Sequence, residues 1–254
     1  MSFLGRQSAI AALTLNALRP LRGQRAGVPA FAAGWLFGET APQMLALTAL
    51  DAATHLTRRR RTGLRGEVGL ALAAASALGL ARIVHQSRRA GDGFEEALIE
   101  GLGVDYVEQL DQVPTPADLA TPWRRLARPF HFADDGVRVI HDLVYAEAGR
   151  RGQLDIHLPA GQDAIKDAPV LLQVHGGAWS IGAKEHQGRP LMNQMAAKGW
   201  VCVAINYRLS PRDAWPAHIV DVKRAIAWVK DNIADYGGDP DYLAITGEIG
   251  RAHV

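Results

Sequence analysis

The chain has 254 residues, which is enough for one large domain or two small ones. Its 48% hydrophobic and 21% charged residues exclude wholesale disorder and indicate a globular protein. Cys202 is the single cysteine, so an internal disulfide framework and a cysteine-cluster zinc site are both excluded. The net charge is only +2, but residues 1–90 carry 12 Arg, no Lys and 3 acidic residues, whereas residues 91–254 are acidic. Two regions with different roles therefore share the chain.

Residues 1–90 are rich in Ala, Leu and Gly, and we predict that they form helices. Pro20 and the stretch Leu21–Gly27 separate a first segment from a second one, Val28–Leu56. Four arginines from Arg58 onward then precede a third segment, Val68–Ala81, which is uncharged throughout. With the acidic, helically patterned stretch that follows, the helical region is predicted to cover residues 1–113.

The partner of this helical region is left open between two alternatives. A membrane span needs about 20 mainly apolar residues, and neither the second nor the third segment provides them cleanly. The arginine cluster is nevertheless placed for contact with lipid headgroups. We therefore expect either a membrane-associated protein that contacts a membrane surface through residues 1–90, or a cytoplasmic helical layer with solvated arginines. A nucleic-acid partner is not expected, because the arginines alternate with long apolar segments.

A proline-rich stretch, residues 114–132, is predicted to be a connector to a second unit over residues 133–254. Short apolar runs without alternation favour strands that are covered on both faces, and their alternation with helices predicts an α/β fold with a doubly wound sheet. The expected strands are Val137–Tyr145, Gln153–Leu158, Val170–Val174, Trp200–Asn206 and Tyr242–Thr246, and the expected helices are Gly188–Lys198 and Ala217–Tyr236.

Three motifs in this half lie at the ends of expected strands. The motif His175–Trp179 reads His-Gly-Gly-Ala-Trp, Asn206–Pro211 reads Asn-Tyr-Arg-Leu-Ser-Pro, and Gly237–Gly247 surrounds the last strand. In this order and spacing they resemble the α/β-hydrolase fold, in the esterase/lipase group of hormone-sensitive-lipase-like and feruloyl-esterase-like carboxylesterases. The resemblance covers about Val137–Gly247 and implies a partial α/β-hydrolase sheet after an all-helical region.

Acyl transfer forms a tetrahedral oxyanion, which backbone N–H groups stabilise. Glycines after a strand allow a close approach to substrate, and the resemblance implies that Gly176 and Gly177 form part of the oxyanion hole. It also implies that His175 supports this loop through ring hydrogen bonds, together with Ala178. Trp179 is expected either to form the floor of an acyl pocket or simply to pack. The resemblance implies no cofactor and no metal.

Five further side chains outside this loop are expected to have no catalytic role. Arg208 is expected to anchor a loop to carboxylates, and Asp221 is expected to be an ion-pair partner. Cys202 is expected to be a small buried core residue. His141 is expected to face solvent, and so is His157.

A nucleophile elbow with the pattern Gly-x-Ser-x-Gly is expected after the strand Tyr242–Thr246. The chain instead places Ile249 at the serine position, and the acid and base of this family follow the nucleophile. We therefore expect this chain to be truncated and inactive. The codons for Glu248–Val254 can match a widely used sequencing adapter, so we expect this segment to be untrimmed adapter sequence. The last expected strand would then lie at the edge of the sheet.

The function that the resemblance implies is hydrolysis of a small-molecule carboxylic ester by a longer, serine-dependent parent protein. An arylformamidase-type amide hydrolase is one alternative, because the His-Gly-Gly-x-Trp pattern resembles that group as well. The other alternative is a non-catalytic membrane-associated protein that retains a vestigial hydrolase half.

Overall fold

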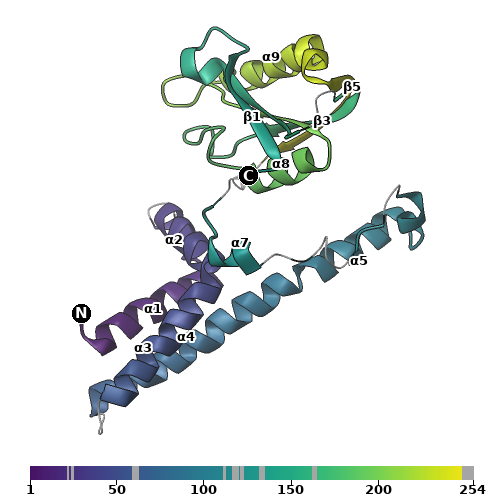
Figure 1. The fold of residues 1–254 in the computed structure, drawn as a ribbon. Coiled ribbons are helices and arrows are strands. Elements are labelled where there is room, and N and C mark those ends of the chain that lie inside the picture. Colours follow the sequence, from purple (N-terminus) through teal and green to yellow (C-terminus); the bar gives the residue numbers. More distant parts are fainter. Residues whose placement is uncertain are drawn as a thin grey trace. The chain divides into compact units, whose positions relative to one another are not determined.

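The structure is a computed structural model of residues 1–254, and it divides into two compact units, Met1–His131 and Phe132–Val254 (Figure 1). It describes the whole chain except residues 22, 24–25, 59–62, 111–112, 116–119, 121–122, 132–134, 162–164 and 248–254. Ile249, the segment Glu248–Val254 and parts of the expected connector and arginine cluster lie outside the described residues.

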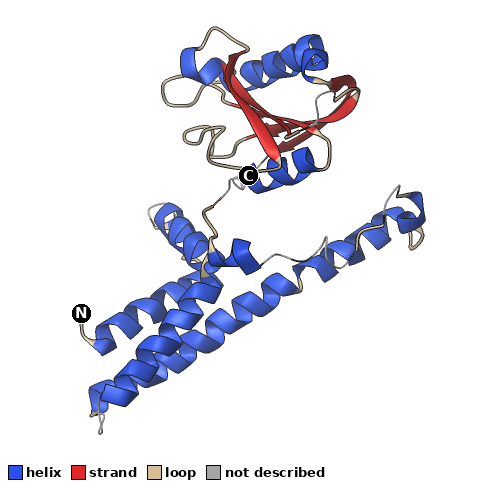
Figure 2. Cartoon of the chain, in the orientation of Figure 1, coloured by secondary structure: helices blue, strands red, loops and turns tan. Residues whose placement is uncertain are grey.

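The first unit is helical, as predicted, and Figure 2 shows no strand in its described part. Its elements are α1 (Phe3–Leu18), α2 (Gly27–Glu39), α3 (Ala41–Arg58), α4 (Leu64–Arg88), α5 (Ala90–Leu102), η1 (Tyr106–Gln109) and α7 (Trp123–Ala127). The expected segment Val28–Leu56 is two helices, because a new helix begins beside Pro42, which is tolerated only in a first turn. The stretch predicted to be a connector contains α7.

The second unit is a five-stranded sheet with helices on both faces (Figure 2). Its strands are β1 (Val137–Val144), β2 (Gln153–Pro159), β3 (Ala168–Val174), β4 (Val201–Ile205) and β5 (Gly238–Gly247), in the spatial order β1-β2-β4-β3-β5. The strands are connected by two α-helices, α8 (Arg189–Ala197) and α9 (Ala217–Asn232), and by two short 3-10 helices, η2 (Gly149–Gly152) and η3 (Ile233–Tyr236).

The predicted α/β fold is confirmed, with a sheet that is mixed. β3 runs parallel to β4 and β5, whereas β2 runs antiparallel to β1 and β4. A short connection through η2 forces β1 and β2 to be antiparallel, because a parallel pair needs a long crossover. Among the described strands β5 is at the edge, and its side chains Tyr242 and Ile245 are more than half exposed.

Alternate side chains of β4 enter two separate apolar layers. Val203 and its neighbours pack against α9 on one face, whereas Cys202 and Ala204 pack against Met192 of α8 on the other. Cys202 is fully buried, as expected, and burial raises the pKa of its thiol to about 12. A strand covered on both faces reads as an unbroken apolar run, and this is why the run was visible in the sequence.

Candidate active site

The parallel strands β3, β4 and β5 bring the three motifs together at their carboxyl ends, where the first two motifs begin and the third motif ends. Val174, the last residue of β3, pairs with Ile205 of β4 on one side and with Gly247 of β5 on the other. His175 and Asn206 therefore begin loops at the same edge, where ligands bind in open α/β sheets.

The loop after β3 has an unusual backbone. Gly177 has a φ of +128°, and the next two residues, Ala178 and Trp179, have φ values of +51° and +55°. Non-glycine residues in this region cost about 1–3 kcal/mol each and persist only where the surroundings fix them. A Cβ atom on Gly177 would lie 2.1 Å from the carbonyl oxygen of Ile181. Only glycine fits at this position.

The backbone N–H groups of this loop differ in availability. Gly176 donates its N–H to Oε1 of Gln187 at 2.5 Å, so this group is already occupied. Within the described part of the chain, the N–H groups of Gly177 and Ala178 donate to no residue. Of the two glycines that the resemblance implied as oxyanion donors, Gly176 thus has an occupied N–H group, and Gly177 has one that donates to no described residue.

His175 has the ring contacts that a supporting role requires. Its Nδ1 lies 3.0 Å from the carbonyl oxygen of Gly176, and its ring stacks on Tyr207 with 4.3 Å between centroids. The Tyr207 hydroxyl donates in turn to the carbonyl oxygen of His175 at 2.7 Å. Burial lowers the pKa of His175, so the imidazole is neutral and Nδ1 donates to Gly176.

Trp179 is 55% exposed, which argues against a simple packing role. Its backbone carbonyl accepts from the N–H of Ser210 at 2.7 Å, and its ring lies 6.4 Å from that of His218. The loop is thus tied to the one after β4, while the indole stays open to a bound molecule. A role for Trp179 as the floor of an acyl pocket remains a prediction.

A buried lysine behind the loop was not found from the sequence. Nζ of Lys184 is held 2.6 Å from Asp155, 2.9 Å from Asp142 and 3.2 Å from Glu185, and its side chain is 1% exposed. Burial lowers the pKa of Lys184, but its carboxylate partners outweigh burial and raise it. The N–H of Lys184 also donates to Oδ1 of Asn206 at 2.9 Å. One residue thus joins β1, β2 and the end of β4 to the segment that follows the loop.

Arg208 and Asp221 each have the structural role expected of them, and they form an ion pair with each other. Nε and Nη2 of Arg208 lie 2.8 Å and 2.7 Å from the two carboxylate oxygens of Asp221, and the Arg208 N–H donates to the same carboxylate. Burial raises the pKa of Asp221, but these hydrogen bonds outweigh it and hold the pKa below its ordinary value.

The two early histidines have different environments. The His141 side chain is 62% exposed, as expected, and its Nδ1 lies 3.1 Å from Asp155. The prediction for His157 is wrong, because it is 4% exposed and its Nδ1 lies 3.3 Å from Oδ1 of Asn193 on α8. The reason is that α8 covers this face of β2.

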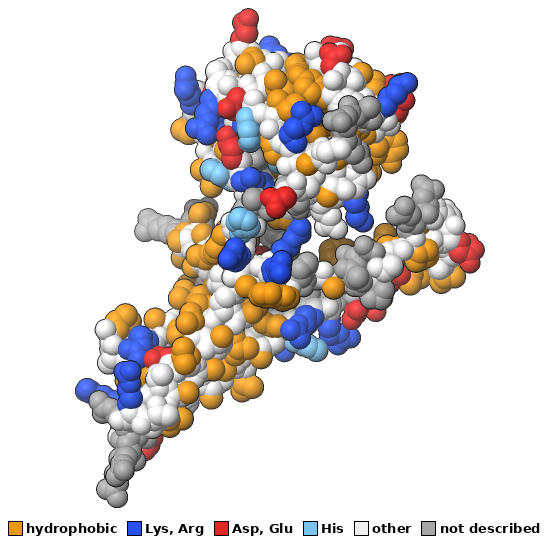
Figure 3. All heavy atoms as spheres, viewed as in Figure 1, with side chains coloured by type: hydrophobic (Ala, Val, Ile, Leu, Met, Phe, Trp, Pro, Cys, Tyr) orange, Lys and Arg blue, Asp and Glu red, His pale blue; other side chains and the backbone are white. Residues whose placement is uncertain are grey.

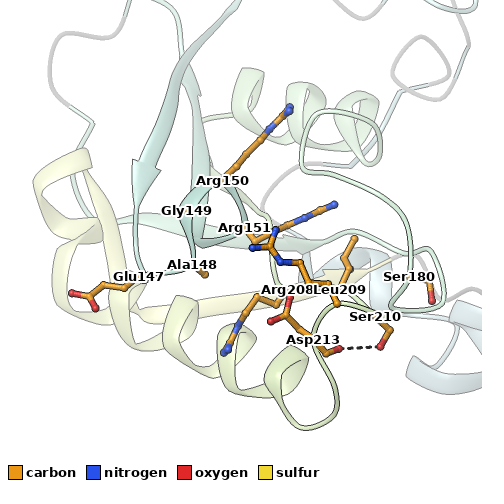
Figure 4. A pocket seen from close by; sticks show the side chains of 11 residues that line it. Glu147, Ala148, Gly149, Arg150, Arg151, Ser180, Arg208, Leu209, Ser210 and Asp213 are labelled. Carbon is orange, nitrogen blue, oxygen red and sulfur yellow. Dashed lines mark hydrogen bonds between the residues drawn. The ribbon is translucent and has the colours of Figure 1, made fainter.

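An open cavity of about 740 Å³ begins beside this loop, at Ser180 (Figure 4). Four arginines line it with Ser210, Asp213 and their neighbours: Arg150, Arg151, Arg208 and Arg212. Ser210 Oγ lies 3.2 Å from Nε2 of His218, but it also donates to the carbonyl oxygen of Asp213. No described residue forms a hydrogen bond with His218 Nδ1, so this pair lacks the orienting acceptor of a nucleophile–base pair. Among the described residues there is no cluster of three or more side chains that could hold a metal.

Comparison with known proteins supports a hydrolase. Residues 154–254 match the BD-FAE family model. The chain is 41% identical to the probable carboxylic ester hydrolase LipM of Mycobacterium tuberculosis, over 96% of this chain and 57% of LipM. It is 57% identical to esterase LipQ of the same organism, over 44% of this chain and 27% of LipQ. A solved structure, a truncated form of a carbohydrate esterase from gut microbiota, is 32% identical over 45% of this chain and 41% of that one, with a TM-score of 0.37.

The fold and these relatives support an α/β hydrolase of the esterase/lipase group, of hormone-sensitive-lipase-like type. The chain spans 57% of the length of LipM, and the match to LipM extends into the helical unit, where the sequence motifs did not reach.

Proposed function

We propose that the protein to which these residues belong hydrolyses carboxylic esters. The carrying observation is the strained backbone of Gly177 and Ala178 at the carboxyl ends of the strands, because their N–H groups donate to no residue that the structure describes. The neutral, stacked His175 forms a hydrogen bond with the carbonyl oxygen of Gly176, which belongs to the same peptide group as the Gly177 N–H. Two relatives are named as esterases, which supports the same reaction.

In this mechanism a serine hydroxyl attacks the ester carbonyl, and the two N–H groups bind the oxygen that becomes negatively charged. The serine is expected at the position of Ile249, with the acid and base later in the chain. Isoleucine has no nucleophilic atom, so we propose that this chain itself has no turnover. The substrate is a small-molecule ester, and the chemistry needs no cofactor and no metal.

The first experiment recovers the gene downstream of the codon for Gly247 from source DNA. The longer protein it encodes is assayed with short p-nitrophenyl esters and labelled with a serine-specific phosphonate. We expect stoichiometric labelling and turnover for the longer protein, and neither for the present chain. Recovery of the same seven final codons followed by a stop, with no labelling, would contradict the proposal. It would favour the alternative of a non-catalytic protein with a vestigial hydrolase half.

A variant of the longer protein tests the oxyanion hole. Gly177→Ala moves this turn away from Ile181, and loss of one aligned donor lowers kcat by roughly 100- to 1000-fold. Gly161→Ala is the control, because Gly161 also has a positive φ but has nothing within 4 Å of an added Cβ. Equal effects of the two substitutions would refute the role of Gly177. Faster turnover of an aryl formamide than of an ester would instead favour the arylformamidase alternative.

For the helical unit we propose contact with a membrane, as opposed to a free cytoplasmic layer. Residues 1–90 contain 12 Arg and 3 acidic residues, a balance that suits anionic lipids. The stretch Leu64–Leu102 is long and apolar enough to cross a membrane, with a mean hydropathy of 1.6 in its best window. Only 22% of that window is buried, whereas the core helix of a soluble protein is mostly buried.

A further inference from the structure

We infer that the helical unit is inserted among the acyl chains of an anionic phospholipid bilayer, and does not merely rest on the headgroups. This inference rests on the membrane contact proposed above. It comes from the distribution of side chains. Besides a small apolar cluster around Phe37, Ala41 and Leu80, the helix contacts bury polar side chains, and many large apolar side chains are exposed, unlike in a water-soluble bundle.

The contacts between the helices bury polar side chains. Thr14 on α1, Thr48 on α3 and Ser76 on α4 are each no more than 3% exposed. Each hydroxyl donates to the carbonyl oxygen four residues earlier in its own helix, at 2.7–2.8 Å. Hydroxyls satisfied in this way pack well inside a membrane bundle, where interfaces are rich in small and hydroxylated residues.

The same contacts use glycine for close approach. A Cβ on Gly69 of α4 would lie 2.7 Å from the ring of Phe3, and one on Gly79 would lie 2.7 Å from the methyl group of Thr14. α1 and α4 therefore approach more closely than larger residues would allow. Between helices in lipid, apolar burial gives no net gain because acyl chains are equally apolar, so association depends on close packing of this kind.

Many large apolar side chains of this unit point outward. Trp35 on α2, Leu50 on α3 and Leu78 on α4 are 59%, 61% and 74% exposed. They are not isolated, because Val28, Phe31, Leu36, Leu47, Leu56, Leu64 and Val68 are exposed as well. Figure 3 shows hydrophobic side chains along the visible face of these helices. Such a surface is costly in water and is matched by acyl chains.

Charged side chains of the described helices lie where headgroups or partners can accommodate them. Arg6 forms a two-pronged pair with Asp51, at 2.6 Å and 3.1 Å, so both charges near this end of α1 and α3 are neutralised. On α4, Glu67 and Arg82 bound the uncharged stretch Val68–Ala81, which is about 21 Å long at the helical rise. This is shorter than the hydrocarbon thickness of about 30 Å, and long arginine side chains that extend to the phosphates cover the difference.

The experiment uses the full chain, synthesised without cells in the presence of vesicles made of equal parts phosphatidylglycerol and phosphatidylcholine. The vesicles are washed with high salt or with alkaline carbonate and then floated in a density gradient, so that aggregates sink. We expect the chain to float after both washes. Release by either wash overturns insertion but leaves surface contact standing. A chain that never floats overturns both proposals, and the esterase proposal is independent of all three outcomes.

Two matched variants identify the face. Leu78→Glu places a charge on the exposed side of α4, whereas Leu191→Glu makes the same change on the exposed side of α8 in the other unit. We expect Leu78→Glu to lower the carbonate-resistant fraction roughly tenfold or more, and Leu191→Glu to leave it unchanged. Equal retention of the two variants overturns the inference. The inference is also overturned if the unsubstituted chain forms a soluble oligomer and Leu78→Glu dissociates it, because a second copy would then cover this face.

Discussion

Replacing Lys184 with methionine tests whether the buried cluster holds the second unit together. The substitution keeps most of the side-chain volume but leaves the Asp155 carboxylate, which is 4% exposed, without its cation. Removing one partner of a buried pair costs about 3–5 kcal/mol. We expect the lower end, about 3 kcal/mol, because Asp155 still accepts the N–H of Asp142 and lies beside the His141 ring. In a unit of this size that corresponds to a fall in Tm of about 10 °C.

The assay is urea unfolding of the full chain in one mild detergent, followed by tryptophan fluorescence. Lys223→Met is the control, because Lys223 is an exposed lysine on a helix and should change the free energy of unfolding by less than about 0.5 kcal/mol. The double variant Lys184→Met with Asp155→Asn should recover part of the loss, since no buried charge is then left unpaired. The reasoning is refuted if Lys184→Met matches its control, or if the two changes cost their simple sum.

Three further predictions concern the same unit. Arg208→Met should destabilise the unit by about 3 kcal/mol in urea unfolding, and Asp221→Asn by about 1–2 kcal/mol. The first change costs more because the fully buried Asp221 carboxylate stays charged without its arginine. The opposite order would contradict this. Burial lowers the pKa of His157, against a hydrogen bond that its ring donates to Oδ1 of Asn193, which raises the pKa. The unfolded state then binds the proton first, so stability should fall as pH drops below about 6.5, and His157→Gln should flatten this dependence; an unchanged pH profile would count against it. Cys202 should resist thiol reagents at pH 8 in the native protein and react fully in urea, because burial raises its pKa to about 12; rapid native labelling would disprove it.

The amino-acid sequence alone was sufficient to predict the strands, the helices of the second unit and the positions of the three motifs. These follow from local signals: unbroken apolar runs mark strands covered on both faces, and glycines after a strand mark a loop of close approach. The structural roles of Arg208 and Asp221 could also be predicted, because an arginine in a loop after a strand commonly binds a carboxylate. That the two residues bind each other came from the structure.

The environments that depend on distant contacts needed the folded chain. Lys184 lies in a polar loop and resembles a solvated residue, although the isolated Asp155 between apolar neighbours of β2 was a usable signal for a buried partner. The occupation of the Gly176 N–H by Gln187 depends on how an eleven-residue segment folds back, which no periodicity encodes.

The helical unit shows the same division. Its composition predicts helices, but α4 has apolar or small residues on every side, so its pattern does not select a face. Only the packing of α1 and α3 against it shows that Ser76 is turned inward and Leu78 outward. The physical reason is that helix propensity is local, whereas burial is a property of the neighbours that tertiary structure brings together.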